Sequence, residues 1–219
     1  MELGVCVSPD RAIAAAELGF DFIECSLSWL AGLDGAEYAA VRRRLAAAGI
    51  PVRSLNGMVP GSIRLTGPDV DRSAIDGYLR LGLGRAGEIG ASVVVFGSGG
   101  ARRVPGGFST AQAWRQLAEF LAACEPIAAA AGIRVAIEPL RRAECNILNY
   151  VSEATALSAL LRLPHVGALG DTYHMAEGGE PLSALAAAGE LLYHVHVSHS
   201  LGPVGRTYPY PGDGEDYAA

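Results

Sequence analysis

The stretch that decides the fold is RVAIEPLRRAE, residues 134–144. It opens with a short apolar run, which is typical of a strand buried on both faces of a parallel sheet. Glu138 stands where this apolar run ends. A carboxylate is costly to bury there without a partner, so Glu138 belongs either to a structural ion pair with an arginine or to a functional site.

Two later stretches repeat this arrangement: VGALGDTYH, residues 166–174, and LLYHVHVSH, residues 191–199. Glu138 and Asp171 are about 30 positions apart, and Asp171 and His196 are about 25 apart, which fits strand–helix–strand units. The carboxyl ends of parallel strands share one edge of a sheet, where α/β proteins build their active sites. We therefore expect an acid or an imidazole at the end of each of three successive strands.

Glutamate, aspartate and histidine together suit a divalent ion such as Mn²⁺, Mg²⁺, Co²⁺ or Zn²⁺. Other interpretations stay open at this stage. Asp171 and His174 could simply cap the next helix, and a lone histidine is more often a satisfied core residue than a ligand. His194 and His196 are two positions apart, so on a strand they face the same side, one nearer the site and one deeper.

The rest of the chain extends the same pattern over its 219 residues. Apolar runs alternate with alanine-rich helical segments, and repeated βα units imply a parallel sheet. We predict a single (β/α)₈ barrel domain over residues 1–219, with a doubly wound open sheet as the alternative. Asp34 and Glu37 form a capping-box pattern, and Pro126 is expected to kink or break a helix that starts at Ser109. The seven expected strands begin near Leu3, Phe20, Val52, Ser92, Arg134, Val166 and Leu191.

Composition excludes several classes of protein. Half of the residues are hydrophobic, 18% are charged and the formal net charge is −6, which indicates a globular chain without a general affinity for nucleic acid. Four scattered cysteines without C-x-x-C spacing suggest reduced thiols in the cytoplasm. We see no signal peptide and no apolar run long enough to span a membrane, and we expect a homo-oligomer.

Four features are weaker than they look. GLGRAG, residues 82–87, matches a dinucleotide fingerprint but lies within an expected helix instead of following a strand. GSGG, residues 97–100, follows a strand but lacks the lysine of a phosphate-binding loop, so we interpret it as a flexible rim of the pocket. His165 precedes a strand and is expected to be structural, whereas His199 either reaches the site or lies in the loop.

At these residues the sequence resembles the xylose-isomerase-like barrel superfamily, and within it the sugar epimerases of the D-tagatose 3-epimerase and D-psicose 3-epimerase type. The segment IEPLRRAECNILNY, residues 137–150, is similar to the Glu-x-Leu-Asn-Arg-x-Glu and Leu-Asn-Thr segment of that family. GDTYHM resembles its Asp-x-x-His segment, and HVHVSHS resembles its His-x-His segment. Weaker similarity covers most of the remaining chain.

The resemblance implies a metal-dependent sugar isomerase or epimerase that abstracts a proton beside a ketose carbonyl through a metal-bound enediolate. The substrate would be a sugar or sugar phosphate, and Mn²⁺ is the preferred ion. An inosose-type dehydratase and a non-catalytic sugar-binding module are the alternatives, whereas the related endonucleases use many more histidines than the five present here. The implied ligands are Glu138, which is also the base, Asp171 and His196; the implied substrate contacts are Glu144, His174 and Arg206.

The family's fourth ligand is a glutamate on the eighth strand, which also serves as the second acid/base group. The last residues, GDGEDYAA, read as the start of a helix near Asp213 or Asp216, and Glu215 in this loop does not qualify as that ligand. We therefore expect the eighth strand to be missing from this chain and the natural gene to continue with a strand ending in Glu. Without it, the first and seventh strands would keep open edges.

Overall fold

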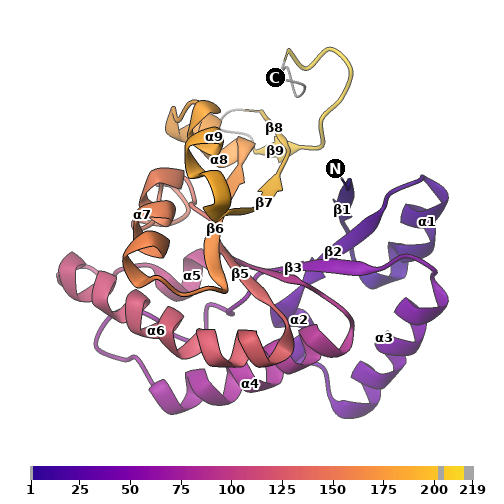
Figure 1. Ribbon diagram of the computed structural model, residues 1–219, viewed down its shortest axis with the longest axis horizontal. Helices are drawn as coiled ribbons and strands as arrows, with labels where there is room; N and C mark the ends of the chain where they lie inside the picture. Colours follow the sequence, from indigo (N-terminus) through magenta and orange to yellow (C-terminus); the bar gives the residue numbers. More distant parts are fainter. Residues whose placement is uncertain (1, 202–204, 215–219) are drawn as a thin grey trace.

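The computed structural model describes residues 2–201 and 205–214. Seven parallel strands form one sheet whose spatial order follows the chain from β1 to β7 (Figure 1). This uninterrupted order is that of a barrel wall, because a doubly wound sheet would reverse its strand order. The strands are β1 (Gly4–Cys6), β2 (Phe22–Ser26), β3 (Val52–Asn56), β4 (Val93–Phe96), β5 (Arg134–Ile137), β6 (Val166–Asp171) and β7 (Leu192–His196).

The predicted barrel fold is confirmed, with seven parallel strands in the described part of the chain. There β1 and β7 are the edges of the sheet, and both are less buried than the central strands. Two short antiparallel strands follow β7, namely β8 (His199–Ser200) and β9 (Arg206–Thr207). The sequence analysis did not predict them. The helix expected near Asp213 and Asp216 falls mainly outside the described residues.

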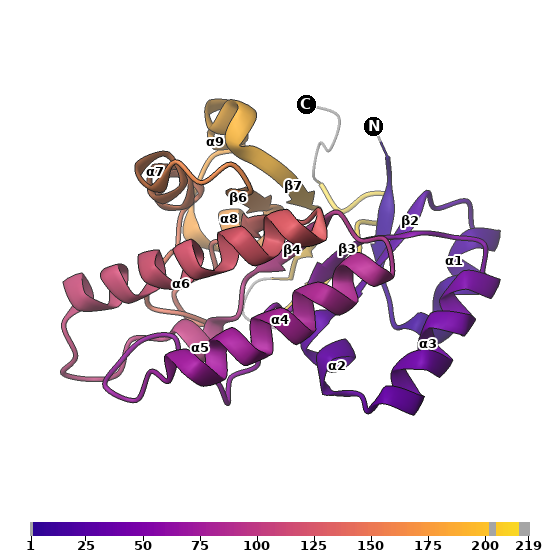
Figure 2. The same cartoon turned by 60° about the horizontal axis from the view of Figure 1, so that its bottom comes forward.

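Helices cover the outer face of this curled sheet, and Figure 2 shows α4 and α6 lying side by side along it. Strands β4 and β6 are buried along their whole length, as expected for strands between a helical layer and a barrel interior. The helices are α1 (Ala12–Glu17), α2 (Leu27–Gly32), α3 (Gly35–Ala47), α4 (Arg72–Glu88), α5 (Gly99–Arg102), α6 (Thr110–Ala131), α7 (Val151–Leu161), α8 (Thr172–Gly178) and α9 (Ser183–Ala188), with 3-10 turns η1 (Pro9–Arg11) and η2 (Gly189–Leu191).

The structure confirms two local predictions from the sequence and contradicts a third. The capping box of Asp34 and Glu37 is present at the start of α3, with both reciprocal hydrogen bonds formed. The expected break at Pro126 is wrong, because α6 runs through it as a single helix. Pro126 lies on the exposed side of α6, where water can satisfy the carbonyl group that its missing N–H leaves free. GLGRAG lies inside α4, as predicted.

Candidate functional site at the carboxyl ends of the strands

Four strands deliver ionisable side chains to one edge of the sheet. Glu24 lies in β2, Glu138 follows β5 directly, Asp171 ends β6 and His196 ends β7. The register of β6 and β7 places Asp171 opposite His196. The three acidic residues are at most 8% exposed, so the cluster lies within the barrel interior.

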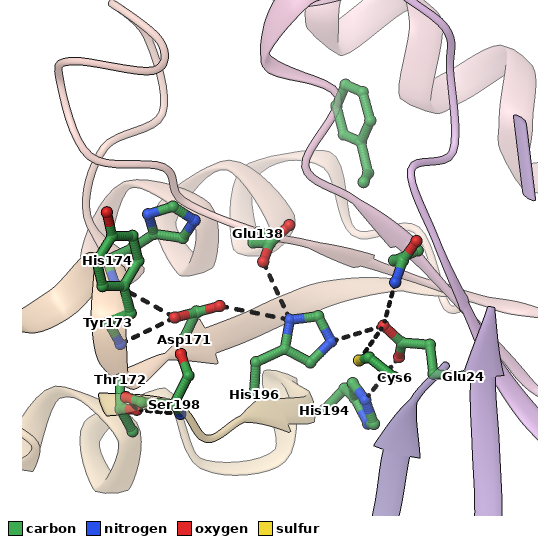
Figure 3. A network of polar contacts seen from close by, with 12 residues as sticks. Cys6, Glu24, Glu138, Asp171, Thr172, Tyr173, His174, His194, His196 and Ser198 are labelled. Carbon is green, nitrogen blue, oxygen red and sulfur yellow. Dashed lines mark hydrogen bonds and ion pairs between the residues drawn. The ribbon is translucent and has the colours of Figure 1, made fainter. Parts of the chain in front are cut away.

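The imidazole of His196 is the centre of this cluster (Figure 3). Its Nδ1 atom lies 3.1 Å from Oε1 of Glu138 and 3.5 Å from Oδ2 of Asp171. On the other side of the ring, Nε2 lies 3.0 Å from Oε1 of Glu24. This oxygen is off the N–H axis, and no described residue gives Nε2 a hydrogen bond of good geometry. The structure therefore brings together the three predicted metal ligands and adds a third carboxylate.

The charges in this cluster depend on one another. Burial disfavours the imidazolium, but the negative charge of Glu24 and the contacts with Asp171 and Glu138 outweigh it and raise the pKa of His196 well above 6.5. Burial likewise disfavours the charged form of Glu24, and for a carboxyl this would raise the pKa. The charge of His196 and the close contacts with His194 and His196 instead hold the pKa of that carboxyl well below 4.5. The His196 imidazolium is therefore the main counter-charge of the buried acids.

Glu24 is the residue of this cluster that the sequence analysis did not single out. Its carboxylate accepts hydrogen bonds from Nδ2 of Asn56 at 3.0 Å and from the Cys6 thiol at 3.3 Å, and it lies 3.2 Å from Nε2 of His194. Burial and the charge of Glu24 raise the pKa of Cys6 to about 12, so the thiol keeps the proton that it donates. The available signal was an acid inside the apolar run FDFIEC.

Asp171 caps the next helix, which is one of the two interpretations that the sequence left open, and its other carboxylate oxygen faces the cluster. Its Oδ1 atom accepts hydrogen bonds from the backbone N–H groups of Tyr173 and His174, so it caps α8. Its Oδ2 atom faces His196 and lies 2.8 Å from Nη1 of Arg206. Burial would raise the pKa of Asp171, but contact with His196 and the charges of His174 and Arg206 lower it to about 2. Arg206 thus reaches the cluster, as its predicted role requires.

The two other predicted substrate contacts lie beside the cluster. His174 is buried, and its Nδ1 atom accepts a hydrogen bond from the backbone N–H of Arg141 at 3.3 Å. The carboxylate of Glu144 is bound by Nε of Arg141 at 2.9 Å, and the same guanidinium lies 3.2 Å from Glu177. Arg141 therefore ties the segment that follows Glu138 to helix α8. The roles of Glu144 and His174 stay predictions.

The remaining histidines lie where the sequence suggested. His165 contacts Glu125 of α6 at 2.7 Å, away from the carboxyl ends of the strands, which agrees with a structural role. His199 lies in β8, with its ring 5.4 Å from that of Tyr210 and its Nδ1 atom 3.9 Å from Asp213. Of the two positions considered for His199, the structure shows the one in the loop region.

The donor set at this edge fits a divalent cation. One ligand atom each from Glu138, Asp171 and His174 lies within 4.8 Å of the others, and Nδ1 of His196 contacts the same two carboxylates. Three buried carboxyl groups face one imidazolium and one guanidinium, so the cluster favours an added positive charge. Oxygen and imidazole donors in this number suit Mn²⁺, Mg²⁺, Co²⁺ or Zn²⁺.

A cavity of about 410 Å³ opens beside Glu24, at the carboxyl ends of β1, β2 and β3. Its lining includes the side chains of Ser8, Ser26, Trp29 and Asn56, which combine hydroxyl and amide groups with a half-exposed indole. A larger cavity of about 610 Å³ lies between α3 and the start of β3, remote from the ionisable cluster. The smaller cavity is therefore the one relevant to the site.

An ordered parallel barrel wall with an acid–histidine cluster at its carboxyl edge defines a TIM barrel with a candidate active site. The chain belongs to the xylose isomerase-like TIM barrel family, which it matches over residues 12–219. The resemblance found in the sequence is thereby confirmed. No helix in the described ranges has the length and apolar character that crossing a membrane requires.

Two curated relatives match shorter segments. The chain is 37% identical to a ketose 3-epimerase of Arthrobacter globiformis over 70 residues, 32% of this chain and 24% of that protein. It is 33% identical to the 3-dehydro-D-guloside 4-epimerase of Escherichia coli K12 over 85 residues, 38% of this chain and 32% of that protein. Each alignment therefore spans about a third or less of the relative's length.

Solved structures share the fold. A D-psicose 3-epimerase crystallised in the presence of D-fructose has a TM-score of 0.80 at 21% identity, over 94% of this chain and 77% of that one. The 3-keto-D-glucoside 4-epimerase of E. coli has a TM-score of 0.76 at 23% identity, over 90% of this chain and 79% of that one. At these identities the likeness concerns the fold.

Proposed function

We propose that the protein is a sugar isomerase, most specifically a metal-dependent epimerase acting beside the carbonyl group of a keto sugar. The observation that carries this proposal is the convergence of Glu138, Asp171 and His196 at the carboxyl ends of β5, β6 and β7. Support comes from the family and from two relatives that are both named as epimerases of keto sugars.

In this proposal Glu138, Asp171 and His196 hold a divalent cation, with Mn²⁺ preferred. Such a cation supplies Lewis-acid polarisation of the substrate carbonyl, which acidifies the neighbouring C–H group. His196 would offer Nδ1 as its ligand atom, because this nitrogen faces both carboxylates. Glu24 lies 3.0 Å from the opposite nitrogen and would help to orient the ring when a metal is bound, as carboxylates commonly do behind a histidine ligand.

Glu138 acts as the base that takes the proton from the carbon next to the carbonyl. Support for this role is that Glu138 follows β5 directly and lies within the buried cluster. Arg206, His174 and Glu144 bind the hydroxyl and carbonyl groups of the sugar. An epimerase returns the proton to the opposite face of the same carbon, and an isomerase returns it to the neighbouring carbon.

The test is a substrate screen with the Mn²⁺-loaded protein. The panel contains free ketoses such as D-fructose and D-allulose, ketose phosphates, a 3-keto-D-glucoside and an inosose, and NMR identifies the products. Inversion of one carbon beside the carbonyl supports the epimerase. Loss of water from the inosose would instead identify a dehydratase, and sugar binding without any conversion would identify a binding module.

A further inference from the structure

Arg102 is the largest side chain that is fully buried in the structure. Its Nη1 atom donates a hydrogen bond to the carbonyl of Phe96 at 2.9 Å. Its Nη2 atom donates to the carbonyl of Glu138 at 2.7 Å and to that of Leu148 at 3.2 Å. One guanidinium group therefore joins the end of β4, the end of β5 and the loop before α7.

A buried guanidinium is expensive unless its donors are satisfied. Here Nη1 and Nη2 donate to backbone carbonyls, whereas Nε has no hydrogen-bond partner among the described residues. Because every residue carries a backbone carbonyl, these bonds constrain the path of the chain. One of the three carbonyls belongs to Glu138 itself. Another belongs to Leu148, a non-glycine residue held at a φ of 58°, a conformation that persists only when its surroundings impose it.

The glycine-rich segment 97–102, which follows β4 and ends as helix α5 with Arg102, also touches the side chain of Glu138. A Cβ atom on Gly97 would lie 2.2 Å from Oε2 of Glu138, so the carboxylate rests directly against the Gly97 backbone. A Cβ atom on Gly99 would lie 2.9 Å from Leu140 and 3.2 Å from the carbonyl oxygen of Glu144. This loop is therefore packed against the segment 138–148 and is not the flexible rim expected from its sequence.

We propose that Arg102 is a positioning residue for Glu138: it locks the peptide that carries the carboxylate, while Gly97 leaves the space that the carboxylate occupies. The functional meaning of this contact rests on the proposed role of Glu138 as ligand and base. The arrangement also explains the GSGG sequence without a phosphate ligand, because the arginine that follows is wholly buried and engaged with carbonyls.

The chain offers a matched control for this proposal. Nη1 of Arg85 donates hydrogen bonds to the carbonyls of Leu30, Ala31 and Leu33 at 2.7, 3.2 and 2.8 Å, far from the acid–histidine cluster. Arg102→Met and Arg85→Met therefore each remove one arginine that binds three carbonyls. Arg102→Lys is the conservative variant, which keeps the charge but loses the planar guanidinium. If Arg102→Met does not fold, Arg102→Lys replaces it in the comparison with Arg85→Met.

Two readouts are measured on each folded variant. Titration with Mn²⁺ should show at least about a tenfold loss of affinity in Arg102→Met, an intermediate loss in Arg102→Lys and less than about a twofold change in Arg85→Met. The second readout is the ¹⁵N chemical shift of the His196 ring in the metal-free protein, which reports its contact with Glu138. It should change in the Arg102 variants and not in Arg85→Met.

Unchanged Mn²⁺ affinity and unchanged His196 shifts in the Arg102 variants would overturn the proposal. Equal losses of affinity in Arg102→Met and Arg85→Met would also overturn it, since they would show a general effect on the fold. If the wild-type protein binds no Mn²⁺ but the His196 shifts move in the Arg102 variants alone, the positioning role stands and the proposed function fails.

Discussion

Nδ1 of His196 lies 3.1 Å from Oε1 of Glu138, although the two residues are 58 positions apart in the chain. The contact joins the ends of β5 and β7 across the barrel interior, with Asp171 of β6 between them in the sheet. It makes His196 the counter-charge of the buried acids in the metal-free protein. In the proposed metal site, the same nitrogen would exchange its proton for the cation.

Replacement of His196 by Ala should therefore lower Mn²⁺ affinity at least about tenfold, because it removes a proposed ligand. His174→Ala is the informative comparison, since His174 lies near the same two carboxylates but its Nδ1 atom is engaged by the backbone of Arg141. We expect His174→Ala to change Mn²⁺ affinity much less. Calorimetric titration measures the Mn²⁺ affinity of both variants. A larger loss of affinity in His174→Ala would mean that the two histidines exchange their proposed roles.

Mn²⁺ affinity should rise with pH. The pKa of His196 is well above 6.5 in the metal-free protein, so binding near neutral pH must displace one proton. We expect the affinity to rise about tenfold per pH unit between pH 6 and 7, with about one proton released per ion. Titrations in two buffers of different ionisation enthalpy count this proton. A pH-independent affinity would contradict this coupling between deprotonation of His196 and metal binding.

The Glu24–His196 pair should also give the metal-free protein a characteristic pH dependence of stability. The raised pKa of His196 contributes stability that is complete below pH 6.5 and is lost as the pH rises through the folded-state pKa. The lowered pKa of Glu24 contributes stability present above pH 4.5 and lost as the pH falls through its folded-state pKa. Both contributions are therefore complete only between pH 4.5 and 6.5.

Glu24→Gln tests this pair. Urea unfolding in the presence of a chelator should show the largest difference between wild type and variant between pH 4.5 and 6.5, shrinking on either side. The neutral amide can still accept a hydrogen bond, so the comparison isolates the charge. A difference that stays constant from pH 4 to 9 would mean that Glu24 acts by packing alone.

Gly97→Ala should displace the carboxylate of Glu138, because the added methyl group would take the place of Oε2. The φ angle of Gly97 is not in the left-handed region, so alanine introduces no backbone strain of that kind. We expect at least about a tenfold loss of Mn²⁺ affinity. The matched control is Gly84→Ala in α4, where a Cβ atom meets nothing within 4 Å. Equal Mn²⁺ affinity in the two variants would contradict the close contact.

Periodic apolar runs predicted the fold well, because buried parallel strands and alanine-rich helices leave strong local signals. They also predicted the meeting of Glu138, Asp171 and His196, since the carboxyl ends of parallel strands share one edge. The continuous helix through Pro126 was missed because exposure of that residue, a tertiary property, decides whether its missing hydrogen bond matters.

Glu24 and Arg102 escaped the sequence analysis for a different reason. A single acid within a strand and an arginine after a run of glycines are common in any α/β chain. Their meaning arises only from contacts across the barrel: Glu24 meets His196 of β7, and Arg102 meets the carbonyl of Glu138 after β5. Sequence spacing did not identify either of these two contacts.

The central claim is that Glu138 removes a proton beside a sugar carbonyl. The most direct test is ¹H NMR in D₂O with Mn²⁺ and each of D-fructose, D-allulose and a 3-keto-D-glucoside, comparing wild type with Glu138→Gln. We predict that wild type exchanges one C–H proton of at least one of these sugars for deuterium. Glu138→Gln should bind that sugar but exchange its C–H proton at least about 100-fold more slowly, because an amide cannot act as a base. The proposal is contradicted if Glu138→Gln exchanges this proton at the wild-type rate. It is also contradicted if the wild type introduces deuterium into none of the three sugars.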